Sequence, residues 1–349
     1  MTHSILTLPV QPRPRDTLDR PLHDLRISVM DRCNFRCPYC MPRETFHEHY
    51  RFLKASERLS FEEITRLTRL FVQLGVQKVR LTGGEPLLRP NISELVGELT
   101  AIDGVRDVAL TTNGVLLAQH AAELKANGLQ RITVSLDTLD PDIFKQMSGG
   151  FAERDRVLDG IRAANDAGLT PVKINCVVER GINDHTVLDL VEHFRGTGVI
   201  VRFIEYMDVG TRNHWSRERV VASRELLERI GAHWPLHAVQ ENYHGEVAER
   251  YVFDDGAGEV GFISSVTNPF CGSCTRARLS SEGVFYTCLF ARSGLDLREP
   301  LRSGASDDEL RSLIAGAWTR RGDRYSELRS SLHAGEQPLR KIEMYYIGG

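Results

Sequence analysis

The sequence contains no run of about 18 apolar residues, the length that an α-helix needs to cross the apolar core of a bilayer. Its formal net charge is only -3, so no overall positive field is available to attract nucleic acid. The apolar stretch at residues 5–10 is too short for the core of a secretory signal. We therefore expect neither a membrane nor a nucleic acid as partner, and we expect the cytoplasm as location.

Cysteine is also scarce, with seven residues in 349. Without an export signal, these cysteines do not indicate a disulfide framework and favour metal binding or redox chemistry. Cys176 stands alone in an apolar run and is expected in the core. The phosphate loop pattern G-x4-G-K-[ST] is missing as well, so a bound nucleotide would be a substrate and would not be held as in P-loop proteins.

Alternation of short β-branched runs with amphipathic stretches is the main structural signal in the chain. It is typical of βα units around a parallel sheet. One helix is expected over residues 61–74, with Ser60 as its N-cap. Strands are predicted over residues 25–30, 77–82, 107–111, 131–136, 172–178 and 200–206.

Six βα units are too few for a closed eight-stranded barrel, so we predict an α/β fold with a partial (βα)6 TIM-like barrel over residues 21–222. Residues 1–20 are interpreted as a flexible leader. After about Ser223 the rhythm changes, which predicts a smaller α+β region over residues 223–349 that closes the barrel and packs across its mouth. In this region we expect helices near 224–230 and 307–320 and strands at 250–253, 260–265 and 284–288.

Three of the cysteines, Cys33, Cys37 and Cys40, stand as C-x3-C-x2-C in the loop after the first predicted strand. A structural zinc site normally uses four protein ligands, and no fourth cysteine or histidine follows at finger spacing. A [4Fe-4S] cluster on three cysteines fits better, because one iron then stays open to a small molecule. Buried structural cysteines and an incomplete zinc site are the alternatives.

A second set of three, Cys271, Cys274 and Cys288, forms C-x2-C-x13-C in the late region. It predicts a second cluster with an open iron, with a zinc site or an ordinary closed cluster as alternatives. Arg276 and Arg278 lie between these ligands. Two residues apart on an extended segment, their guanidinium groups would point to the same side and suit a polyphosphate.

The first cysteine set resembles the signature of the radical SAM superfamily, in which S-adenosylmethionine chelates the open iron. A Thr-Gly-Gly-Glu-Pro turn at 82–86 follows the second strand, where glycine lets the backbone approach a ligand. From about residue 25 to 349 the chain also resembles the GTP 3',8-cyclase family of molybdenum cofactor biosynthesis. The motifs that carry this resemblance are both cysteine sets, 82–86, 110–114, 134–137, 202–205, 275–278 and the terminal pair 348–349.

The resemblance implies a barrel of the radical SAM type and assigns site residues to it. S-adenosylmethionine would contact Tyr39, Gly84, Ser135 and Met207. GTP would contact Arg26, Arg80, Thr111, Lys173, Arg276, Ala277 and Arg278, with Lys78 as a further candidate. Arg276, Arg278, Gly348 and Gly349 are implied in catalysis, with the two glycines entering the active site as a tail.

The implied activity is a lyase reaction: a 5'-deoxyadenosyl radical starts the conversion of GTP to a 3',8-cyclised dihydroguanosine triphosphate. A flavodoxin or ferredoxin as electron donor, a downstream enzyme that receives the product, and a monomer or homodimer are expected with it. Two other classes stay open. One is a peptide-modifying radical SAM enzyme with an auxiliary cluster, and the other is an iron–sulfur redox sensor without turnover.

Overall fold

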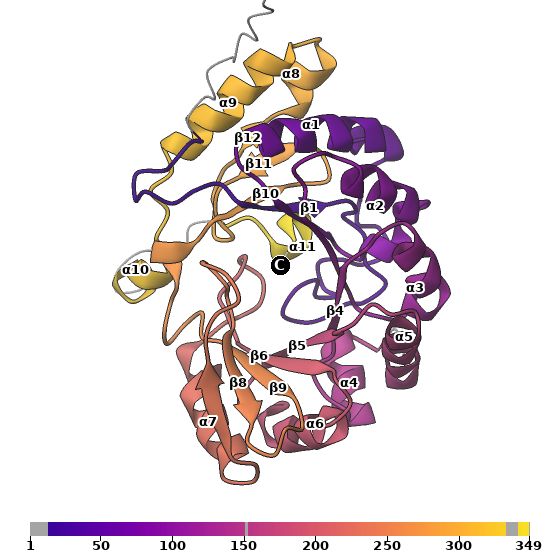
Figure 1. Cartoon of the computed structure of the whole chain (residues 1–349), viewed down its shortest axis with the longest axis vertical. Coiled ribbons are helices and arrows are strands. Elements are labelled where there is room, and N and C mark those ends of the chain that lie inside the picture. The colour runs from indigo at the N-terminus through magenta and orange to yellow at the C-terminus, as the bar shows by residue number, and fades with distance from the viewer. Residues whose placement is uncertain (1–12, 151–152, 333–340, 349) are drawn as a thin grey trace, which may run out of the picture.

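The computed structural model describes residues 13–150, 153–332 and 341–348. Its strands form one curved twelve-stranded sheet in the order β12-β11-β10-β1-β2-β3-β4-β5-β6-β9-β8-β7. The helices between the first six strands lie on the outside of the curve (Figure 1). All described strands thus belong to one sheet.

The first six strands pair in parallel and in sequence order. The predicted strands are confirmed to within one or two residues at each end. Their observed bounds are β1 (Asp24–Ser28), β2 (Lys78–Thr82), β3 (Asp107–Thr112), β4 (Arg131–Ser135), β5 (Lys173–Val178) and β6 (Ile200–Glu205).

The first long helix shows why the predicted periodicity holds. In α1 (Phe61–Gln73), Ser60 accepts from the backbone nitrogen of Glu63, and the Glu63 side chain accepts from the backbone of Ser60. Ile64, Leu67, Leu70 and Phe71 form its buried face. The crossovers that follow contain α2 (Ile92–Thr100), α3 (Leu117–Ala126), α4 (Pro141–Ser148), α5 (Arg154–Asp166) and α6 (Val187–Phe194).

The C-terminal region joins the barrel sheet at both edges. β10 (Arg276–Leu279) pairs in parallel with β1, and β9 (Glu259–Ile263) pairs in parallel with β6. The late strands thus extend the barrel sheet, because the open edges of β1 and β6 have unpaired backbone groups with which these strands form hydrogen bonds. The remaining elements are α7 (Ser223–Gly231), β7 (Leu236–Val239), β8 (Glu249–Phe253), β11 (Val284–Tyr286), β12 (Leu295–Asp296), α8 (Arg298–Arg302) and α9 (Asp307–Thr319).

The sheet does not close on itself. Among the described residues, β12 and β7 are the outer strands and have no hydrogen bonds to each other. α10 (Tyr325–Leu332) lies at the side of the ring, and α11 (Met344–Ile347) lies near its centre, where the chain ends (Figure 1). The predicted α/β partial barrel is confirmed, and the end of the described chain lies inside it.

The prediction of a flexible leader is wrong for residues 13–20. Asp16 and Arg20 are buried, with 7% and 2% of their surface exposed. The proline-rich sequence suggested a loose segment, but two buried charges that pair with each other and with residue 321 hold it in place. Residues 1–12 lie outside the described residues.

Candidate active site

A single cavity of about 340 Å³ is lined by residues of both cysteine sets and of the barrel strands. Cys33, Cys37 and Cys40 contribute from the loop after β1, and Cys271, Cys274 and Cys288 contribute from the C-terminal region. Cavities of this size hold small molecules. The two sets, far apart in sequence, therefore face a common space.

The first cysteine loop is tightly turned. The backbone nitrogen of Cys40 donates to the Cys37 carbonyl (3.0 Å), and that of Phe35 donates to Cys33 Sγ (3.3 Å). Burial, followed by the charge of Glu85, raises the pKa of Cys33 to about 12. Burial and mutual repulsion among the three sulfurs raise the pKa values of Cys37 and Cys40 as well. These thiols lie close enough to interact, and a cationic group would offset their repulsion as thiolates.

The chemistry of the two donor sets fits iron–sulfur clusters better than a mononuclear ion. Within the described parts of the chain, no three Cys, His, Asp or Glu side chains are arranged around one metal ion position. In a four-iron cluster each cysteine binds a different iron. The cysteine sulfurs therefore lie farther apart than the ligands of a single zinc ion. The three partly buried cysteines of each set line one cavity, and three protein ligands would leave one iron of such a cluster open to a small molecule.

The Gly-Gly turn after β2 packs directly on the first cysteine loop. The backbone nitrogen of Gly84 donates to the Met30 carbonyl (2.7 Å), and that of Glu85 donates to the Arg32 carbonyl (2.8 Å). A Cβ atom on Gly83 or Gly84 would fall closer than 3.0 Å to these carbonyl oxygens. The glycines are thus required for the approach of the turn to the cysteine loop as well as to the cavity.

Tyr39 and two carboxylates for which no separate role was predicted, Asp137 and Glu85, hold this end of the cavity. Tyr39 donates its hydroxyl proton to Asp137 (2.7 Å). Glu85 accepts from the hydroxyl of Thr112 (2.7 Å) and from the backbone nitrogen of Asn113 (2.8 Å), while burial raises its pKa to about 7. Of the residues expected at S-adenosylmethionine, Tyr39, Gly84, Ser135 and Met207 all line the cavity.

The middle of the cavity is rich in cationic side chains. Arg26 lies between Arg80 and Arg278 in the register of β2, β1 and β10. Burial and then the charges of Arg278, Arg80 and Arg276 lower the pKa of Arg26. Neighbouring strands thus present like charges to one another, which a bound polyanion would neutralise.

Other basic groups strengthen this charge. Burial lowers the pKa of Lys173 to about 8 and that of Arg202 to about 9, each with further repulsion from neighbouring guanidinium groups. In the described part of the chain, no ion pair with a carboxylate involves Lys173 or Arg202, whereas Arg131 pairs with Asp107. Arg202 and Arg131 were missed as site residues, although both stand in strands that had been predicted.

Of the remaining predicted GTP residues, Thr111 and Lys78 line the cavity, whereas Ala277 does not. Thr111 lines the cavity and accepts a hydrogen bond from Arg80 (2.9 Å). Lys78 lines it too and forms ion pairs with Asp24 and Asp107. Ala277 is fully buried in the hydrophobic core between the two cavity-facing arginines of β10, so its side chain points away from the cavity.

The C-terminal tail reaches the cationic strand. Arg278 Nε donates to the Gly348 carbonyl (3.3 Å). Gly348 has φ +72°, and a Cβ atom there would collide with the side chain of Thr82. Glycine is thus needed at this point for both conformation and space. Gly349 lies outside the described residues.

The second cysteine set has more cationic surroundings than the first. Cys271 begins a short turn, and the backbone nitrogen of Phe290 donates to Cys288 Sγ (3.5 Å). Burial raises the pKa of Cys274, but Arg276 and Arg321 outweigh it and lower the value to about 6. Arg321 was not expected at the site, and no motif in the sequence marks it.

Two family models match this chain. Residues 27–194 match the radical SAM superfamily, and residues 199–327 match the C-terminal domain of molybdenum cofactor synthesis. Crystal structures of Streptococcus suis SuiB have a related fold. One aligns at a TM-score of 0.60 with 16% sequence identity, covering 94% of this chain and 77% of SuiB. The fold, the cysteine loop and the family model together show that this is a radical SAM protein. Membership of this superfamily supports S-adenosylmethionine and an iron–sulfur cluster as cofactors.

Curated relatives are more specific. A GTP 3',8-cyclase of Xanthomonas axonopodis pv. citri is 54% identical over 99% of this chain and 100% of its own length. The enzymes of that name from Acidothermus cellulolyticus and Staphylococcus epidermidis are 50% and 45% identical, each over 96% of this chain and 99% and 98% of their own lengths. The chain belongs to the GTP 3',8-cyclase family, as its motifs predicted. No described helix has the length and apolar character needed to cross a membrane.

Proposed function

We propose that this protein converts GTP to (8S)-3',8-cyclo-7,8-dihydroguanosine 5'-triphosphate, the first step of molybdenum cofactor biosynthesis. In this reaction a hydrogen atom leaves C3' of the ribose, C3' bonds to C8 of guanine, and one electron and one proton complete the product. The observation that carries the proposal is the single cavity that is lined both by the two three-cysteine sets and by several like-charged arginines.

Cys33, Cys37 and Cys40 would hold the cluster of the S-adenosylmethionine site. When bound and reduced, this cluster would supply the electron for cleavage of S-adenosylmethionine to methionine and a 5'-deoxyadenosyl radical. Gly83 and Gly84 fix the loop through its backbone, while Asp137 orients the Tyr39 hydroxyl at the cavity wall. Ser135 and Met207 complete the lining on this side.

The cationic strands bind the triphosphate. Arg26, Arg80, Lys173, Arg276 and Arg278 offer charge-assisted donors to a group with up to about four negative charges. Guanidinium groups on paired strands keep fixed positions, so the ribose is held in one orientation relative to the deoxyadenosyl group. Binding of the anion also excludes water from the reacting carbon.

Cys271, Cys274 and Cys288 would hold a second [4Fe-4S] cluster, which would supply a Lewis-acidic iron for the guanine end of GTP. The tail at Gly348 closes the cationic side of the cavity through its contact with Arg278. The proposal also includes a flavodoxin or ferredoxin as electron donor and a downstream enzyme that receives the product. We further propose that the protein is a cytoplasmic monomer or homodimer. The boundary between barrel and C-terminal region near residue 222 stays a prediction.

The test is an oxygen-free reconstitution followed by incubation with reductant, S-adenosylmethionine and each nucleoside triphosphate. We expect about eight irons per chain, the content of two cubes. We also expect 5'-deoxyadenosine together with a cyclised product from GTP alone. GTP deuterated at C3' should transfer its label to 5'-deoxyadenosine. Unlabelled 5'-deoxyadenosine, or equal turnover with ATP, would contradict the proposal and direct attention to peptide substrates.

A further inference from the structure

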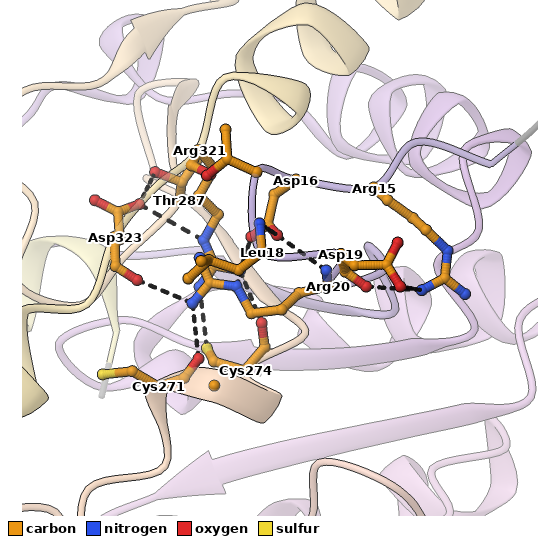
Figure 2. Close-up of polar contacts among 12 residues, drawn as sticks. Arg15, Asp16, Leu18, Asp19, Arg20, Cys271, Cys274, Thr287, Arg321 and Asp323 are labelled. Carbon is orange, nitrogen blue, oxygen red and sulfur yellow. Dashed lines mark hydrogen bonds and ion pairs between the residues drawn. The ribbon is translucent and has the colours of Figure 1, made fainter.

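Asp16, Arg20 and Arg321 form a buried charge network behind the second cysteine loop (Figure 2). Asp16 Oδ2 accepts from Arg20 Nε (2.6 Å) and from Arg321 Nη1 (3.1 Å). Asp16 Oδ1 accepts from the backbone nitrogens of Leu18 and Arg20, each at 2.9 Å. The side chains of Asp16, Arg20 and Arg321 are at most 2% exposed. One carboxylate thus fixes two guanidinium groups away from solvent.

Both guanidinium groups hold the cysteine loop itself. Arg20 Nη1 donates to the Cys271 carbonyl (2.7 Å) and to the Asp323 carbonyl (2.9 Å). Arg321 Nη1 donates to the Cys274 carbonyl (2.7 Å), and Arg321 Nη2 lies 3.2 Å from Cys274 Sγ. Two ligands of the proposed cluster are therefore attached to the network, one by its backbone and one by its backbone and its sulfur.

Arg321 has little freedom to move. Its guanidinium group lies over the Trp318 ring, 4.5 Å from the centroid, and the Trp318 Nε1 proton goes to the Arg20 carbonyl (3.1 Å). The Thr17 hydroxyl donates to the Arg321 carbonyl (2.7 Å). A charge held this firmly next to a sulfur acts as a fixed electrostatic element and does not relax when the sulfur changes charge.

We propose that Asp16, Arg20 and Arg321 are positioning residues for the second cluster, and that Arg321 raises its reduction potential. This inference depends on the proposed presence of that cluster. Reduction adds negative charge, which spreads onto the cysteine sulfurs, and a buried cation with a hydrogen bond to one sulfur stabilises the reduced form more than the oxidised form. The residues of the N-terminal segment thereby become part of the active-site structure.

The test compares reduction potentials of the second cluster in the full-length holoenzyme by redox titration followed by EPR. Arg321→Lys keeps a positive charge but replaces the two spaced Nη atoms with one compact ammonium group, which weakens the contacts to Asp16 and to Cys274. Arg321→Gln removes the charge. We expect a more negative potential in Arg321→Lys and a larger negative shift in Arg321→Gln, with the signal of the first cluster unchanged. Arg15→Met is the matched control, because Arg15 forms an exposed pair with Asp19 in the same segment.

The outcomes separate this inference from the proposed function. A wild-type protein with about four irons and one cluster signal would overturn the second cluster and this inference together. With about eight irons in the wild type, an unchanged potential in iron-loaded Arg321→Gln would overturn the inference alone. If Arg321→Gln does not retain the second cluster, Arg321→Lys decides, and a wild-type potential in that variant is the contradicting result.

Discussion

The two cysteine loops have the same number of ligands but differ in what surrounds the sulfurs. At Cys33 the donors are the backbone nitrogen of Phe35 and the Asn113 amide, which lies 3.7 Å from the sulfur. Burial dominates there and raises the thiol pKa to about 12. At Cys274, Arg276 and Arg321 outweigh burial and lower the pKa to about 6. Equal ligand counts therefore do not make equivalent sites.

The loops also differ in how they are fixed. The first is held by close backbone contact, with the glycines at 83 and 84 packed against the carbonyls of Met30 and Arg32. The second is held by long side chains from positions about 250 residues earlier and about 50 residues later in the chain. Backbone contact tolerates no added atom, whereas guanidinium contacts depend on charge. The first site should therefore be sensitive to substitutions that add side-chain atoms, and the second to substitutions that remove charge.

The largest expected difference comes from removing one cysteine of each set. Cys37→Ala should abolish 5'-deoxyadenosine formation with and without GTP, because the first cluster supplies the electron for cleavage. Cys274→Ala should keep cleavage of S-adenosylmethionine and lose the cyclised GTP product. Mass spectrometry of both products measures this. Cys176→Ala is the control, since this buried cysteine belongs to neither set. If both Cys37→Ala and Cys274→Ala lose cleavage of S-adenosylmethionine, the two cysteine sets do not have separate functions.

The next largest effect should come from Gly84→Ala. Its Cβ atom would collide with the Arg32 carbonyl, so the first cysteine loop must move. We expect loss of the first cluster and a decrease of about 1–3 kcal/mol in the free energy of unfolding. Iron analysis and denaturant unfolding measure the two quantities. Gly231→Ala, at the end of α7, meets no atom within 4 Å and should leave both unchanged. Normal iron loading in Gly84→Ala would show that the contact can relax.

A smaller effect is expected from Lys173→Met at the cationic strands. Loss of one charged donor should raise the KM for GTP about 10- to 100-fold, in line with about 1.5–3 kcal/mol for such a hydrogen bond. Cleavage of S-adenosylmethionine without GTP should be unaffected. Steady-state kinetics measure this, with the exposed Lys145→Met as control. An unchanged KM would place the triphosphate away from β5.

The smallest effect is a pH dependence of GTP binding. Burial and the charges of Arg202 and Arg131 lower the pKa of Lys173 to about 8 in the free protein. Triphosphate binding favours the protonated amine, so affinity should decrease as the pH rises above about 8, by up to about tenfold per pH unit for one proton. Lys173→Arg should flatten this dependence, because guanidinium stays charged. Calorimetry between pH 7 and 9 checks it, and an equal slope in both proteins would exclude Lys173 as the titrating group.

Sequence patterns predicted those parts of the molecule that rest on local signals. The barrel strands follow from β-branched runs, α1 follows from Ser60 and its apolar face, and both cysteine sets follow from their spacing. The pairing of β10 with β1 could not be predicted, because the alternation in Arg-Ala-Arg-Leu shows which side chains share a face but not which strand lies beside it.

The network behind the second loop was missed for a related reason. Asp16 and Arg20 stand in a polar, proline-rich segment, and Arg321 follows a helix end, so each has an ordinary surface explanation in sequence. Only the tertiary structure buries them together. Arg202 and Asp137 belong to motifs that were recognised, but neither was predicted to line the site, since one charged residue in or after a strand does not reveal which face of the sheet lines a cavity.

The parallel pairing of β10 with β1 joins residues 24–27 to residues 276–279. During synthesis on a ribosome, the first cysteine loop and its barrel strands emerge long before this pairing can form. Until β10 is made, one edge of β1 therefore lacks its partner strand. Closing such a long loop is also slow and costly in chain entropy. The cationic strand, the second cysteine set and the N-terminal contacts behind it must therefore be assembled last, after the barrel that they complete.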